Sequence, residues 1–128
     1  MIYLASPYTS PSHAVQDCRF ASACAAAARL MQEGHIIFSP IVHGHSVAQH
    51  GDLPAEWAFW REWCIAMLDK ADELWVLQLG GWVDSVGVQA EIKHAFQTDK
   101  PVRMVNPATL YVSFPFRAFA CDLAADSH

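Results

Sequence analysis

The sequence is short of charge, and of positive charge in particular. Charged residues make up 16% of its 128 residues, only eight are lysine or arginine, and the formal net charge is −5 at pH 7. Binding to nucleic-acid phosphates needs concentrated lysine and arginine, so we expect no nucleic-acid polymer as a partner. Because 53% of the chain is hydrophobic, we expect an ordered domain with part of its surface covered by another copy.

Segments that would direct the chain to a membrane are also lacking. The first ten residues, MIYLASPYTS, contain no basic segment and no long apolar run, so no signal peptide is predicted. Nor does the sequence contain a run of about 18 apolar residues free of charge. We therefore expect no membrane partner and a cytoplasmic location.

Metal and cofactor motifs are sparse as well. Without a CxxC spacing, the four cysteines are predicted to be buried, reduced thiols: Cys18, Cys24, Cys64 and Cys121. His43, His45 and His50 include an HxH pair, but Asp52 is the only acidic residue near them, so no metal is expected. These histidines either face solvent or line a pocket. The chain has neither GxGxxG nor GK[ST], and we expect no cofactor.

What the sequence does contain is an alternation of strands and helices. The predicted strands are 2–5, 35–40, 73–79 and 101–105, with 110–114 as a further edge strand. The predicted helices are 13–33, 55–71 and 86–98, whereas 41–54 has no period and is predicted as a long loop. Residues 115–128 are predicted as a terminal helix or loose tail of the same domain, 1–128. This alternation predicts an α/β, flavodoxin-like (Rossmann-like) parallel sheet with helices on both faces and the order 2-1-3-4, or 2-1-3-4-5.

In such a sheet, ligands bind outside the carboxyl ends of the strands. This rule places three segments around one crevice: SPYTS (6–10), SPIVHGH (39–45) and GGWVDSVG (80–87). Glu91 follows the last segment, on the flank of the apolar stripe of the predicted helix, which consists of Val88, Ile92, Ala95 and Phe96. A poorly hydrated, ionised carboxylate there would suit a nucleophile at a sugar carbon. An exposed glutamate that interacts with the helix dipole is the alternative.

The glycine-containing turn before Glu91 is equally open to two interpretations. Its N–H groups and the Ser85 hydroxyl could hold an anion, with Gly87 allowing close approach, or the glycines could serve the turn alone. Trp82 is either a core residue or a platform on which a base stacks.

Several of these segments resemble those of a known superfamily. IYLASPY, FSP, ADELWVL, SVGVQAEIKHA and KPV occur in the order found in the nucleoside 2-deoxyribosyltransferase superfamily, over about residues 2–105. That superfamily includes the 2'-deoxynucleoside 5'-monophosphate N-glycosidases, and the likeness is to a branch with the signature GW…S.GV..E. The resemblance implies cleavage or transfer at the N-glycosidic bond of a nucleoside or nucleoside 5'-monophosphate, without a cofactor.

The resemblance also implies roles for individual residues. Glu91 corresponds to the nucleophile that attacks C1', Tyr3 to a tyrosine near it, and Ser85 to a serine that contacts the 5'-phosphate. Ser6 and Pro7 fall in the first sugar- or phosphate-facing loop. Further candidates for substrate binding are Gly87, Asp84, Trp82 and His43. A serine rather than an aspartate at position 85 favours nucleotides, although Asp84 beside it keeps nucleosides open.

One position departs from the family pattern. Cys64 stands where the family carries an aspartate that handles the leaving base, and a thiol is a poor substitute for a carboxylic acid in proton transfer. Glu62 or Asp69 could replace it, although neither shares the helical register of Cys64. The alternative function is therefore a nucleotide-binding or sensing domain that has lost catalysis.

The helix predicted at 55–71 bears on assembly. Its core stripe leaves Phe59, Trp63 and Ile65 pointing elsewhere, and a helix that is apolar around much of its circumference is buried on two sides. We predict a homodimer or a dimer of dimers with Trp63 in or near the interface. The resemblance likewise implies an oligomer whose neighbouring subunit helps to close the site.

Overall fold

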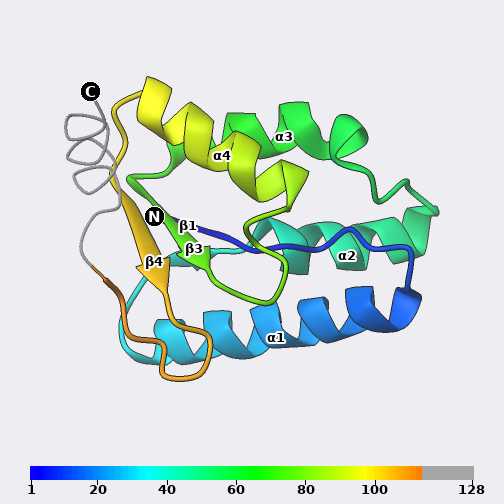
Figure 1. Ribbon diagram of the computed structural model, residues 1–128, viewed down its shortest axis with the longest axis horizontal. Helices are drawn as coiled ribbons and strands as arrows, with labels where there is room; N and C mark the ends of the chain where they lie inside the picture. Colours follow the sequence, from blue (N-terminus) through cyan, green and yellow to red (C-terminus); the bar gives the residue numbers. More distant parts are fainter. Residues whose placement is uncertain (114–128) are drawn as a thin grey trace.

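The computed structural model describes residues 1–113, which form an α/β domain with one parallel sheet. Its elements are β1 (Ile2–Ala5), α1 (His13–Gln32), β2 (Ile37–Phe38), α2 (Pro40–Gly51), α3 (Trp57–Lys70), β3 (Glu73–Leu77), α4 (Val86–Gln97) and β4 (Val102–Val105) (Figure 1). The four strands are parallel and lie in the order β2-β1-β3-β4. The predicted flavodoxin-like architecture is confirmed.

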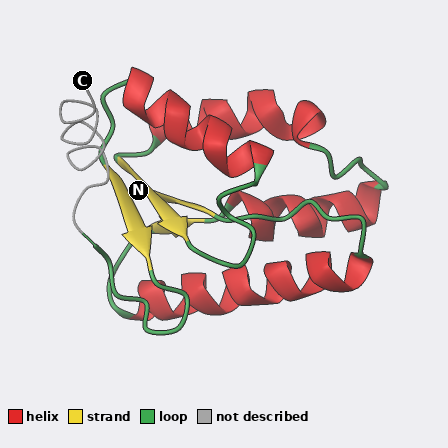
Figure 2. Cartoon of the chain, viewed as in Figure 1, coloured by secondary structure: helices red, strands yellow, loops and turns green. Residues whose placement is uncertain are grey.

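Helices cover both faces of the sheet, with α3 and α4 on one side and α1 on the other (Figure 2). Side chains of a strand alternate between its two faces, so each strand contributes to two cores. Tyr3 and Val76 belong to the core beneath α3 and α4. Leu4 and Trp75 belong to the opposite core, together with Leu30 of α1. Within residues 1–113, no helix is both long and apolar enough to span a membrane.

Helix α1 agrees closely with its prediction. Ser12 caps its N-terminus, since the Ser12 hydroxyl accepts a hydrogen bond from the Val15 N–H at 3.3 Å. Its small side chains let it approach the sheet, where Ala23 and Ala26 are buried. The cysteine prediction is partly wrong here, because Cys18 lies on the exposed side of α1.

The predicted loop at 41–54 is wrong, because most of it forms α2. The Ser39 hydroxyl accepts a hydrogen bond from the Val42 N–H at 3.2 Å, and Pro40 occupies the first turn, where its missing N–H costs nothing. The interior of α2 is poor in strong helix formers. Burial of Gly44 and His45 against the rest of the domain stabilises the helix instead.

Two further predictions need correction at the edges of the sheet. β2 is limited to Ile37–Phe38 rather than 35–40. The edge strand predicted at 110–114 is reduced to one antiparallel bridge between Val105 and Val112, because the chain turns at Leu110 with φ of 59°. Within the described residues the sheet therefore has four strands. The predicted terminal helix or tail, 115–128, lies outside the described residues.

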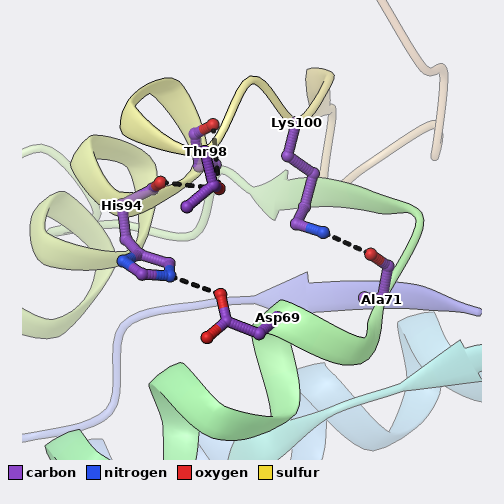
Figure 3. A network of polar contacts seen from close by, with 6 residues as sticks. Asp69, Ala71, His94, Thr98 and Lys100 are labelled. Carbon is purple, nitrogen blue, oxygen red and sulfur yellow. Dashed lines mark hydrogen bonds and ion pairs between the residues drawn. The ribbon is translucent and has the colours of Figure 1, made fainter.

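A polar network ties the C-terminal parts of α3 and α4 together (Figure 3). The His94 imidazole Nε2 pairs with Asp69 Oδ1 at 2.5 Å, and the Lys100 ammonium donates to the Ala71 carbonyl. Thr98 closes α4 by donating its hydroxyl to the His94 carbonyl at 2.9 Å. The His94–Asp69 and Lys100–Ala71 contacts therefore connect the C-terminal ends of the two helices.

Candidate active site

A cavity of about 450 Å³ opens at the carboxyl end of β1. It is lined by the loop after β1, by α2, and by the first turns of α3 and α4. Its volume lies within the range of small-molecule sites in proteins, roughly 300 to 1,000 Å³. Its location is the one that ligands favour in parallel α/β sheets.

Glu91 lines this cavity from α4 and is only 4% exposed. The Ser85 hydroxyl caps α4 by accepting from the Val88 N–H at 3.2 Å, so Glu91 lies in the second turn, beside buried Val88 and Ile92. The hydroxyl of Tyr3, which is fully buried on β1, donates a hydrogen bond to Glu91 Oε2. The alternative of an exposed glutamate at the helix terminus is therefore wrong.

Burial is the largest influence on the pKa values of Glu91 and Tyr3. Loss of solvent raises the pKa of Glu91 to about 8, and the hydrogen bond from Tyr3 only partly opposes that rise. Burial, together with the negative charge of Glu91, also raises the pKa of Tyr3 well above its usual value. At neutral pH the Glu91 carboxyl is therefore mostly protonated. The sequence predicts an ionised carboxylate at this position, whereas burial in the structure favours the neutral form.

Cys64 lines the same cavity from α3, next to Tyr3 and Glu91. Burial and the neighbouring Glu91 carboxylate raise the pKa of the thiol to about 12, so Cys64 is a neutral thiol over the ordinary pH range. The two acids considered as substitutes for it lie elsewhere. Glu62 is exposed and is not among the lining residues, and Asp69 pairs with His94 on the far part of α3.

Four of the predicted binding residues line the cavity: Ser6, Asp84, Ser85 and Gly87. Ser6 is 4% exposed, and its hydroxyl has no hydrogen-bond partner among the described residues. A buried polar group without a partner costs about 1–3 kcal/mol, which a ligand at this hydroxyl would offset. At Gly87, an added Cβ would lie 3.0 Å from the Trp57 ring, so any larger residue there requires the ring to shift by a few tenths of an ångström.

The other three predicted binding residues do not line the cavity. Pro7 is fully buried. Trp82 is partly buried against the core beneath α3 and α4. His43 is exposed on α2 and stacks on Trp63, with ring centroids 4.8 Å apart.

The sequence left His45 open between facing solvent and lining a pocket, and the structure places it in the wall of the cavity. Its Nδ1 lies 2.6 Å from the Tyr8 hydroxyl, and Phe20 stacks on its ring with centroids 3.9 Å apart. Trp57 and Trp60 add indole rings to the wall. If 40–51 is taken as a helix, Pro40, Gly44 and His45 fall on one face of it. This is the buried face of α2, so the helical period identifies His45 as a lining residue.

Arg19 holds together the two loops at the rim of the site. Its Nη1 donates to the Thr9 carbonyl at 2.9 Å, and its Nη2 donates to the Gly80 carbonyl at 3.1 Å. Next to Gly80, Gly81 has φ of 93°, and a Cβ there would meet Arg19 Nη2 at 2.5 Å. The positive φ favours glycine at position 81, whereas the contact with Arg19 involves the far end of a flexible side chain that can shift.

Residues 1–106 match a family model described as "Domain of unknown function (DUF1937)", which covers β1 to β4 and every residue of the candidate site. No curated protein matches the chain.

Proposed function

The chain belongs to the family described as a domain of unknown function (DUF1937), and for this member we propose cleavage or transfer at the N-glycosidic bond of a nucleoside or nucleoside 5'-monophosphate. The observation that carries the proposal is the buried Glu91 carboxyl, which lines the cavity and accepts a hydrogen bond from Tyr3. The resemblance to the nucleoside 2-deoxyribosyltransferase superfamily gives the same two residues these roles.

The proposed reaction is a double displacement. Ionised Glu91 attacks C1' of the sugar as the C1'–N bond breaks, and the base leaves with the bonding electron pair. Water or a second base then attacks C1' and regenerates the Glu91 carboxylate. The attacking molecule gives up one proton, and the departed base takes up one proton in its place. The Tyr3 hydroxyl orients the carboxylate by its hydrogen bond, and the unpartnered Ser6 hydroxyl is free to bind a hydroxyl of the sugar.

The test is release of free base from a panel of ribo- and deoxyribonucleosides and their 5'-monophosphates, followed by chromatography. We expect Glu91→Gln to lower kcat/KM by at least about 1,000-fold while the protein stays folded. Glu62→Gln, an exposed glutamate on α3, is the matched control and should leave the rate unchanged. If wild type and Glu91→Gln are equally inert with every compound, the proposal is refuted.

A second function, nucleotide binding or sensing without catalysis, is favoured by one observation. The thiol of Cys64 beside Glu91 is neutral and gives a departing base no effective acid. A binding domain would show an increase in Tm with a nucleoside or nucleotide that is recovered unchanged after prolonged incubation. If the same compound is consumed, the protein is an enzyme and the hypothesis of a binding domain without catalysis is refuted.

A further inference from the structure

The acidic side chains that line the cavity outnumber the cations near it. Glu56 and Asp84 line it at the starts of α3 and α4, and Glu91, mostly neutral at pH 7, adds a third negative charge when it ionises. The Arg19 guanidinium lies at the rim, where the Thr9 and Gly80 carbonyls hold it. No lysine or arginine lines the cavity in the part of the chain that the structure describes, and His45 is the one lining imidazole there. Such a site opposes anionic ligands and favours cationic ones.

Aromatic rings add to this preference. The indoles of Trp57 and Trp60 and the phenol of Tyr8 line the same cavity. The faces of such rings attract cations, and most strongly so when solvent is excluded. Flat walls of this kind also suit a planar ring, so carboxylates and aromatic walls together select a planar cation.

The chemistry at Glu91 leads to the same kind of ligand. A neutral base leaves a sugar efficiently only when an acid protonates it, and the group next to Glu91 is the thiol of Cys64. A base that already carries a positive charge needs no such proton. The ring nitrogen of a pyridinium, for example, becomes neutral simply by keeping the electrons of the bond that breaks.

We propose that the site takes an N-glycoside whose base is a cationic heteroaromatic ring, such as a pyridinium nucleoside. This inference rests on the proposed function and specifies its substrate. The C1'–N bond breaks with both electrons passing to the ring nitrogen, and a Glu91 oxygen forms the new bond to C1'. Water then displaces Glu91 and releases one proton to solvent, so the products are the sugar and a neutral base. The buried, unpartnered hydroxyl of Ser6 binds the sugar.

Cleavage of nicotinamide riboside and inosine at pH 8 tests the proposal. Each enzymatic rate is divided by the rate without enzyme, because the pyridinium compound is intrinsically more reactive. We expect wild type to accelerate cleavage of nicotinamide riboside at least about 100-fold more than that of inosine. Cys64→Asp, which places a carboxyl beside Glu91, should raise inosine cleavage at least about tenfold, whereas Cys64→Ser should not.

The outcomes separate this inference from the proposed function. Equal or greater acceleration with inosine would overturn the cationic substrate and leave glycosidic cleavage standing. Release of base from neither compound would also overturn the inference, and the proposed function would then be judged by the wider panel of nucleosides and nucleotides.

A binding measurement keeps the proposal testable if Cys64→Asp does not fold. By calorimetry, wild type should bind 1-methylnicotinamide, a cation, at least about tenfold more tightly than neutral nicotinamide. The double variant Glu56→Gln/Asp84→Asn removes two exposed carboxylates and should reduce that ratio at least about threefold. Equal affinity of wild type for the two compounds would refute the charge selection.

Discussion

Replacement of Glu91 by glutamine should remove a pH dependence from the stability of the fold. Burial raises the Glu91 pKa from its ordinary 4.5 to about 8, so the folded protein holds a proton that the unfolded chain has lost over this interval. The stabilisation from that proton is fully present below about pH 4.5 and is lost as the pH rises through about 8. Each pH unit is worth about 1.4 kcal/mol, which gives a total on the order of 5 kcal/mol. Glutamine has nearly the same shape, can accept the hydrogen bond from Tyr3, and does not titrate.

Urea unfolding of wild type and Glu91→Gln from pH 5 to pH 9 measures this effect directly. Contributions from other titrating groups cancel in the difference between the two proteins, and that difference should shift in favour of the variant by several kcal/mol over the range. The exposed control Glu62→Gln should show no comparable trend. A difference between wild type and Glu91→Gln that stays constant from pH 5 to pH 9 would refute the burial argument.

Three further measurements follow from the same structure. With any compound that is cleaved, kcat/KM should rise about tenfold per pH unit up to about pH 8 and then level off, because only ionised Glu91 attacks C1'. A fall in kcat/KM above pH 8 would indicate instead that Glu91 acts as an acid. Gly81→Ala should lower the free energy of unfolding by about 1–2 kcal/mol, since its φ of 93° strains any other residue. Gly80→Ala, where a Cβ meets open space, should lower it clearly less. Equal urea midpoints for the two variants would contradict this expectation. Light scattering should give a mass two or four times the 14.2 kDa of one chain, because α3 leaves Phe59 exposed and Trp63 only partly buried. A stable single-chain mass at micromolar concentration would rule out the predicted homodimer or dimer of dimers.

The sequence by itself determined the order of the elements and the architecture. Alternation of apolar strands with helices predicted a parallel sheet in the order 2-1-3-4, because right-handed crossovers permit few other arrangements. The period of Val88, Ile92 and Ala95 predicted the buried face of α4. These features depend on residues close together in the chain. The helix α2 escaped prediction because its caps are local but its stability comes from the packing of Gly44 and His45.

Only the tertiary structure decided the character of the candidate site. Tyr3 and Glu91 are 88 residues apart in sequence, and their hydrogen bond exists because α4 packs over the same core of the sheet to which Tyr3 belongs. The raised pKa of Glu91, the unpartnered hydroxyl of Ser6 and the gathering of carboxylates in the cavity wall arise in the same way, from groups that distant segments bring together. Spacing along the chain fixes which side of its own helix a residue occupies. Solvent exclusion and the neighbouring charges are set by the other elements, and they decide whether that residue carries a charge.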